Sequence, residues 1–186
     1  MPARHRFTRE EITDTAFMIV RDSGMDALTA RSLASELSAS PKVIFGHFTG
    51  MDELRDEVMS KAGGLYASLM TKALNRKDIL PYRSCGMCFV RFAHDEKELF
   101  RLLFMNDGRQ GLSFDDPTLG PICSVISEAL GVSLEDAKEM HARYSVFAYG
   151  LACMAVISPE PLDEDKTDML LCENWEDLVK RYRRGK

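Results

Sequence analysis

Helix-start signals divide the first part of this chain into short helical segments, and no other sequence feature limits its fold as strongly. Thr8 stands three residues before Glu11, which is the spacing of a capping box. Apolar residues then recur at helical spacing up to Gly24, a helix-stop residue. Thr29 is the expected N-cap of a second helix of about two turns. Helices this short are stable only when their apolar faces pack together.

A third short helix is predicted over Lys42–Phe48. Ser40 is its expected N-cap, and Pro41 suits the first helical position, where a missing N–H costs nothing. Ile44 and Phe48 are four residues apart, so both can turn inward. Three such helices with a tight turn before the last one form a helix-turn-helix, whose last helix enters the major groove of DNA. The residues left facing outward are Lys42, Val43, Phe45, Gly46 and His47.

The rest of the chain shows helical spacing and no strand-like alternation, so the predicted fold class is all-α. Further helices are expected over about residues 51–75, 78–94, 96–106, 117–130, 134–157 and 163–184. The stretch 107–117 is a loop by composition. A break at Thr49-Gly50 separates two predicted domains. Residues 1–50 are predicted to form an N-terminal three-helix helix-turn-helix domain, and residues 51–186 are predicted to form a C-terminal helical domain.

Composition narrows the class of protein. The chain has 186 residues, of which 45% are hydrophobic, and a net charge of −5, as is typical of a globular protein. Neither a membrane-spanning run nor the apolar core of a signal peptide is present in the sequence, so we expect a cytoplasmic protein with no membrane partner. Its five cysteines, an odd number, indicate reduced thiols. Catalytic motifs are absent from the sequence, which predicts no enzyme, no cofactor and no metal site.

Residues 8–54 resemble the DNA-binding domain of the TetR family of transcriptional regulators. The matching pieces are Thr8–Ile12, Ala16-Phe17, Gly24, Thr29–Ala34, Ser40, Phe45–Phe48 and Leu54. Residues 91–93 and 98–105 resemble the fifth and sixth helices of many family members. The resemblance implies an all-helical homodimer, usually a repressor, in which residues 51–186 form the helical ligand-binding and dimerisation domain. In such a protein a small molecule enters the C-terminal domain and shifts the two DNA-reading heads apart.

Three residues depart from the family pattern. Ser38 stands where the family often has glycine, which predicts a strained turn or a different turn geometry. Phe45 replaces a common tyrosine and Met51 replaces a common lysine, so two contacts to phosphate are lost. Fewer phosphate contacts predict a shallower salt dependence of DNA binding.

The helix-turn-helix pattern and the resemblance together give a set of expected DNA contacts. The set is Arg4, Arg6, Thr29, Arg31, Ser40, Lys42, Val43, Phe45, Gly46 and His47. Arg4 and Arg6 would form an arm that enters the minor groove, and the alternative for them is a solvated terminus.

Aromatic and sulfur-containing side chains supply the expected ligand pocket. The resemblance implies a cavity, and flexible thioethers suit a site that adapts to several ligands. The predicted lining residues are Tyr66, Met70, Cys85, Cys88, Phe89, Phe92, Phe104, Tyr144 and Phe147. For each of them the alternative is ordinary core packing.

Cys85 and Cys88 lie three residues apart and share one face of a predicted helix. They are interpreted as a redox switch, as half of a metal site, or as two small apolar residues beside Phe89 and Phe92. No second pair of histidines or cysteines in the sequence completes a four-ligand metal site.

Residues 133–157 are apolar on more than one side, so this helix can pack within its own subunit and against a partner. Together with the last helix it supplies the four-helix interface that the resemblance implies. The predicted interface residues are Leu151, Met154, Trp175, Leu178 and Tyr182. The alternative is burial of these residues within one subunit.

The sequence therefore predicts a ligand-responsive DNA-binding transcriptional regulator, most simply a repressor that releases operator DNA when a small apolar molecule binds its C-terminal domain. Its expected partners are double-stranded operator DNA, a small-molecule effector and a second copy of the chain. Two alternatives stay open. One is a thiol redox-sensing regulator that works through Cys85 and Cys88, and the other is a small-molecule-binding helical protein without specific DNA recognition.

Overall fold

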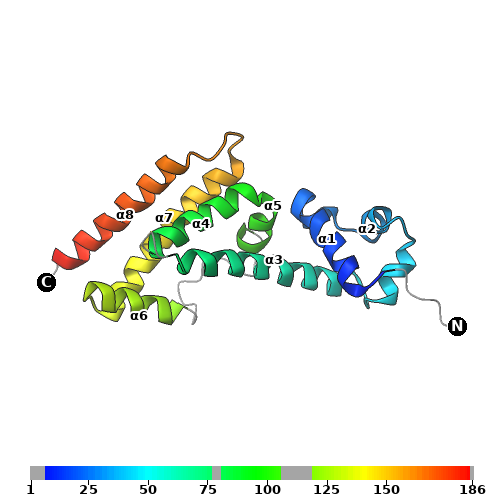
Figure 1. The fold of residues 1–186 in the computed structure, drawn as a ribbon, viewed down its shortest axis with the longest axis horizontal. Coiled ribbons are helices and arrows are strands. Elements are labelled where there is room, and N and C mark those ends of the chain that lie inside the picture. The colour runs from blue at the N-terminus through cyan, green and yellow to red at the C-terminus, as the bar shows by residue number, and fades with distance from the viewer. Residues whose placement is uncertain (1–6, 77–80, 106–118, 185–186) are drawn as a thin grey trace. The chain divides into compact units, whose positions relative to one another are not determined.

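The computed structural model describes residues 7–76, 81–105 and 119–184, and every regular element among them is a helix (Figure 1). The chain divides into two compact units, and the division falls within the long helix α3 (Met51–Leu74). The first unit runs up to Ser68 and takes in the segment that begins at Glu96. It therefore extends beyond residue 50, and the assignment of DNA binding to residues 1–50 stays a prediction.

The first unit is built around short helices whose apolar faces meet in one core. Its elements are α1 (Arg9–Ser23), η1 (Met25–Ala27), α2 (Ala30–Glu36), η2 (Pro41–Gly46), the first part of α3, α5 (Lys97–Phe100) and η3 (Arg101–Met105). Helix α1 contacts η1, α2 and α5, and α2 contacts η2. The fully buried core residues are Ile12, Ala16, Val20, Leu28, Leu33, Ile44, Leu54, Val58, Leu99 and Phe100.

The predicted start and end of the first helix are confirmed. The Thr8 backbone N–H donates to Oε2 of Glu11 over 2.7 Å, and the Glu11 N–H donates to Oγ1 of Thr8 over 3.1 Å. This is the reciprocal pair of a capping box. Gly24 ends the helix with φ +81°, a backbone conformation that residues other than glycine rarely adopt.

The third predicted helix is wrong in type and length. Residues Pro41–Gly46 form a 3-10 helix, η2, in place of an α-helix over 42–48. Two β-branched residues, Val43 and Ile44, and Gly46 all lower α-helix propensity in this six-residue segment. The tighter i→i+3 turn is common in pieces this short.

The predicted helix over 96–106 is divided in the described residues. An α-helical turn, α5, passes into a π-helical segment, η3, over Arg101–Met105. Leu102 and Leu103 are adjacent and both buried. The wider π-helical turn lets these neighbouring residues face the same core. Helical periodicity alone does not predict this change of helix type.

The second unit takes in the end of α3 from Leu69, α4 (Pro81–Asp95), α6 (Leu119–Leu130), α7 (Leu134–Ile157) and α8 (Glu164–Arg184). Helices α4, α7 and α8 contact one another, and α6 packs on α7 (Figure 1). The bounds of α7 coincide with the predicted 134–157. The loop 107–117 and the predicted helix starts at 78 and 117 lie outside the described residues. None of the described helices combines the length and apolarity needed to cross a membrane.

Candidate nucleic-acid interface

The turn between α2 and η2 precedes residues 41–48, which we call the recognition segment. Ser38 adopts φ +48° and is the one non-glycine residue with positive φ among the described residues. Its N–H donates to the Ser35 carbonyl over 3.0 Å, and the Ala39 N–H donates to the Ala34 carbonyl over 2.9 Å. These two bonds form a Schellman motif, in which glycine usually fills the position of Ser38. Ser38 therefore adopts the left-handed conformation that favours glycine, and strain at this turn stays a prediction.

Helix α2 begins after Thr29, the expected N-cap, which forms a capping box with Ser32. Oγ1 of Thr29 accepts from the Ser32 N–H over 3.0 Å, and the Ser32 hydroxyl donates to the Ala27 carbonyl over 2.7 Å. Thr29 and Arg31 are both exposed, as a DNA contact requires. Ser40 is exposed at the N-cap position of η2, but its side chain makes no capping hydrogen bond.

The side chains of the recognition segment divide into an inner and an outer set. Ile44 and Phe48 are 0% and 3% exposed, as predicted, and they anchor the segment. Phe45 is 51% exposed. The remaining predicted contacts are exposed at Lys42 and Gly46 and half-buried at Val43 and His47. Arg4 and Arg6 lie outside the described residues.

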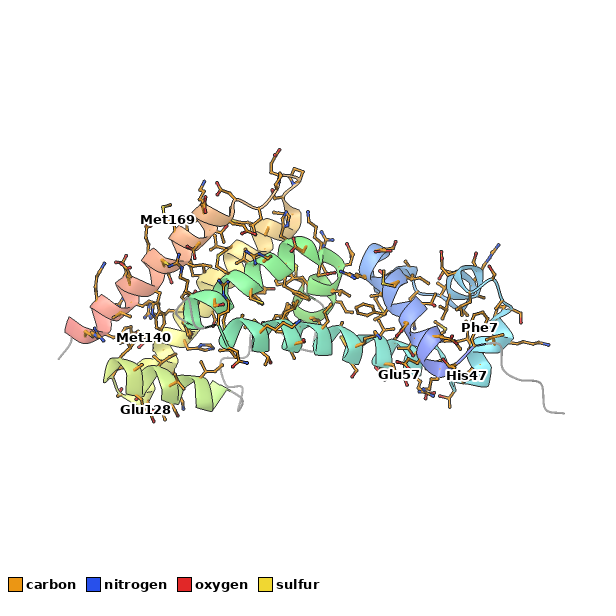
Figure 2. All side chains as sticks on the ribbon, viewed as in Figure 1. Phe7, His47, Glu57, Glu128, Met140 and Met169 are labelled. Atoms are coloured by element: carbon orange, nitrogen blue, oxygen red, sulfur yellow. The ribbon has the colours of Figure 1, made fainter. Side chains whose placement is uncertain are left out.

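Sequence reasoning missed one polar side chain at this site. Arg9, the first residue of α1, donates through Nη1 to the His47 carbonyl over 2.6 Å. It also contacts the carboxylates of Glu53 and Glu57 on α3. Figure 2 shows His47 and Glu57 beside the N-terminal end of α1. The partners of Arg9 are 38 to 48 residues away in the chain, so no local motif could have indicated them.

The predicted pocket residues are divided between the two units. In the first unit, the rings of Tyr66 and Phe104 meet edge to face, with centroids 5.0 Å apart. In the second unit, Phe92 and Tyr144 are buried, at 2% and 4% exposed. The others, Met70, Cys85, Cys88, Phe89 and Phe147, are half-buried there. That these residues line one cavity stays a prediction.

An aromatic cluster in the second unit joins three helices. Tyr82 on α4 stacks on Trp175 of α8 at a centroid distance of 4.2 Å and lies 4.6 Å from the Tyr144 ring on α7. The Tyr82 hydroxyl is hydrogen-bonded to Nδ1 of His141. Burial lowers the pKa of His141 and raises that of Tyr144. Trp175, a predicted dimer residue, thus packs on aromatic rings of its own unit.

The other predicted interface residues differ in exposure. Leu178 is 8% exposed and Met154 is 65% exposed, while Leu151 and Tyr182 are half-buried. Met154 therefore offers the largest free apolar surface of the predicted set, and the interface itself stays a prediction.

The two cysteines of α4 sit in an environment that favours the neutral thiol. Burial raises the pKa of Cys85 to about 11 and raises that of Cys88 as well. Since the thiolate is the reactive form, this environment disfavours the redox interpretation of the pair.

The family comparison agrees with this geometry. Residues 12–58 match the model of the bacterial regulatory proteins, tetR family. The chain is 33% identical over 110 residues to an uncharacterised HTH-type transcriptional regulator of Haemophilus influenzae. That alignment covers 58% of this chain and 54% of the relative, so the chain spans about half the length of the curated relative that it matches. Family and relative are both described as regulators and not as enzymes.

Two solved structures share the fold. One is a Mesorhizobium loti protein described as a TetR-family transcriptional regulator, with a TM-score of 0.61 and 15% identity over 95% of this chain and 99% of that one. The other is the multidrug binding protein EbrR complexed with imidazole, with a TM-score of 0.55 and 20% identity over 94% and 93% of the two chains. The fold class is therefore confirmed as an N-terminal helix-turn-helix followed by a helical domain. The N-terminal helix-turn-helix of this chain, over residues 12–58, is thus similar to that of the tetR family of bacterial regulatory proteins.

Proposed function

We propose that this chain is a homodimeric, cytoplasmic repressor that binds operator DNA through η2 and releases it when a small apolar molecule binds its C-terminal helices. One observation carries the proposal. The recognition segment buries Ile44 and Phe48 and presents Lys42, Phe45 and Gly46 to solvent, within the residues that match the family model. A DNA groove offers both of these side chains a partner, because an apolar side chain can contact the methyl group of thymine and a lysine can contact phosphate.

Each exposed residue suits a different part of DNA. Lys42 is placed for phosphate or for guanine, both of which accept from an ammonium group. Phe45 has no hydroxyl to reach phosphate and suits the methyl group of thymine. Gly46 has no side chain, so the backbone can come close to the groove.

Ligand release is supported by the character of the C-terminal side chains. Half-buried aromatic and sulfur-containing residues, among them Phe89, Cys85 and Met70, suit an apolar ligand. EbrR, which shares the fold, is described as a multidrug binding protein. A coupling free energy of about 1–3 kcal/mol would weaken operator binding about 5–150-fold when the ligand is bound.

Dimerisation is supported by an apolar stripe on α7. Val146, Met154 and Ile157 are 54%, 65% and 74% exposed, and their spacing of eight and eleven residues places them on one helical face. A two-fold dimer through such a face would present two recognition segments to the two halves of a pseudo-palindrome.

The DNA contact is tested with duplex selected by the wild-type protein from a random pool. Lys42→Ala should weaken binding to selected and random duplex alike and reduce the salt slope by about 0.9. Phe45→Ala should weaken binding to the selected duplex by about tenfold and random duplex hardly at all. Lys138→Ala, which removes an exposed lysine of α7, is the control. Equal effects of Lys42→Ala and Lys138→Ala would contradict the proposed role of η2.

The dimer face is tested by placing a charge on it. Met154→Glu should convert a particle of twice 21.0 kDa into one of 21.0 kDa in sedimentation equilibrium and should lower operator affinity with it. Val125→Glu is the matched control, because Val125 is 66% exposed on α6. A wild-type protein that sediments as a monomer would contradict the dimeric part of the proposal.

A further inference from the structure

Arg9 connects three parts of the first unit through one side chain. Nε donates to Oε1 of Glu57 over 2.7 Å, Nη2 donates to Oε1 of Glu53 over 2.5 Å, and Nη1 donates to the His47 carbonyl over 2.6 Å. Its guanidinium carbon also lies 4.3 Å from the centroid of the Phe48 ring. Arg9 thus joins α1 to α3 and joins both to the residues that follow η2.

Only an arginine can make this set of contacts. Its planar group offers five N–H donors in fixed directions and stacks on an aromatic face, whereas a lysine offers one point charge on a flexible stem. The three acceptors come from a main-chain carbonyl and two carboxylates on successive turns of α3, at Glu53 and Glu57. A planar fork meets all of them at once.

The recognition segment needs such an external support. Element η2 is six residues long, contains Gly46 and lacks a side-chain cap at Ser40. Helices of the 3-10 type have poorer hydrogen-bond geometry than α-helices. Its C-terminal end is closed by hydrogen bonds of 3.0 Å from the N–H groups of His47 and Phe48, both to the Ile44 carbonyl. Arg9 donates to the His47 carbonyl at this same end.

Glu53 extends the contact through the next two residues. Its Oε2 accepts from the Thr49 N–H over 2.7 Å and from the Thr49 hydroxyl over 2.8 Å. Glu57 in turn accepts from the Thr13 hydroxyl over 2.7 Å. The chain from His47 to Thr49 is therefore held on the carbonyl side by Arg9 and on the amide side by Glu53.

We propose that Arg9 is a positioning residue for DNA recognition, which holds residues 47–49 so that the outward side chains of η2 meet the groove. It acts through the main chain of His47 and through Glu53, and it does not contact DNA. The inference rests on the proposed function and adds a residue outside the DNA-facing set. A general brace between α1 and α3 is the opposing explanation, and the two differ in where the effect of a substitution appears.

The test compares Arg9→Met with Lys61→Met in the full-length protein. Lys61 also pairs α3 with α1, through Asp14, and lies 5.8 Å from the Phe17 ring, but it contacts none of residues 47–49. The first readout is amide hydrogen exchange in the absence of DNA. Arg9→Met should speed exchange at His47, Phe48 and Thr49 at least about tenfold more than in the core of α1. Lys61→Met should not.

The second readout is the ratio of affinities for the selected and a random duplex. Arg9→Met should reduce this ratio at least about tenfold, while the affinity for random duplex stays within about twofold. Arg9→Lys should restore charge without restoring the ratio. If Arg9→Met does not fold, Glu53→Gln serves instead, because it weakens the same hold on Thr49 while keeping the side-chain shape.

Two results would overturn the inference. One is equal acceleration of exchange throughout α1 and residues 47–49, which is the signature of a general brace. The other is an unchanged affinity ratio in Arg9→Met. A wild-type protein without any sequence preference would contradict the proposed function instead, and the exchange experiment would still decide whether Arg9 positions residues 47–49.

Discussion

Arg21 in the last turn of α1 and Glu96 directly before α5 form a two-point ion pair across 75 residues of chain. Nε of Arg21 donates to Oε2 of Glu96 over 2.6 Å, and Nη2 donates to Oε1. The Glu96 side chain is 12% exposed. Leu99 and Phe100, both fully buried, follow it in α5. The α5 segment is thus held on the end of α1 by a charged contact as well as by apolar packing.

Removing this pair should lower the stability of the first unit. Arg21→Met is expected to reduce the free energy of unfolding by about 1 kcal/mol, since the pair is two-pointed and the carboxylate is mostly covered. A double-mutant cycle with Glu96→Gln, measured by urea denaturation, should return a coupling of similar size. Lys180→Met removes exposed pairs with Glu176 and Asp177 on its own helix, α8, and should cost less. A coupling near zero would show that the contact adds nothing to stability.

Glu53 should make stability depend on pH in acid. The hydrogen bonds from Thr49, together with Arg9, lower the pKa of Glu53 to about 2, against about 4.3 in an unfolded chain. A lowered pKa means that the native state holds fewer protons, so the stabilisation is full above pH 4.3 and is lost as the pH falls toward 2. The difference in unfolding free energy between wild type and Glu53→Gln should be constant from pH 5 to 7 and shrink below.

Two measurements test whether the acid dependence of stability comes from the contacts of Glu53. One adds salt, and the other repeats the comparison in the Arg9→Met variant. The Glu53 side chain is 34% exposed, so 1 M salt should reduce the effect. In an Arg9→Met background the acid-dependent part should become smaller but persist, because the Thr49 amide still donates. A difference that stays the same from pH 7 to pH 2 would exclude the lowered pKa.

Replacing serine by glycine should have opposite effects on stability at Ser38, in the turn, and at Ser35, in α2. Ser38→Gly is expected to stabilise the protein by about 0.5–1 kcal/mol, because glycine adopts φ +48° without steric cost. The greater conformational entropy of glycine in the unfolded chain offsets part of this stabilisation. Ser35→Gly lies in α2 and should destabilise by about 0.5 kcal/mol. Urea unfolding curves compare the two directly. Destabilisation by Ser38→Gly would mean that the turn is not strained.

Gly86 on α4 lies directly against Tyr144 of the aromatic cluster. A Cβ atom there would lie 2.3 Å from the hydroxyl oxygen of Tyr144 and 3.3 Å from Cδ1 of Leu171. Tyr144 is held between Tyr82 and Trp175, so its ring cannot move aside cheaply. Gly86→Ala should therefore destabilise the second unit by about 1–3 kcal/mol.

The chain contains a single tryptophan, so Trp175 fluorescence reports on this cluster and should change in Gly86→Ala. Gly64→Ala is the control, since nothing lies within 4 Å of a Cβ there, and it should stabilise α3 by about 0.5–1 kcal/mol. An unchanged unfolding midpoint and unchanged fluorescence in Gly86→Ala would show that the helices can shift to accept a methyl group.

Local signals predicted much of the fold. The caps at Thr8 and Thr29 depend on residues three positions away, and the bounds of α7 follow from its apolar spacing and its end at Ser158. The type of η2 did not follow, because the choice between a 3-10 and an α-helical turn in six residues depends on how Ile44 and Phe48 reach a core built elsewhere.

At the candidate site, the sequence predicted the residues that face outward but not the contacts that hold them in place. Exposure of Lys42 and Phe45 follows from the inward position of Ile44 and Phe48, which is a local relation. The support from Arg9 is a relation between α1, η2 and α3 and leaves no periodic trace in the sequence. The stacking of Trp175 on Tyr82 is likewise a contact between two helices that are distant in the sequence, so periodicity does not indicate it.

Fluorescence anisotropy can measure whether the protein binds DNA sequence-specifically through two recognition segments. The wild-type protein is titrated at 150 mM salt with the selected duplex, with the same duplex scrambled in one half, and with random duplex. We expect binding to the selected duplex to be at least about 10³-fold tighter than to random duplex, and most of that preference should be lost when one half is scrambled. Equal and weak binding to all three duplexes would contradict it.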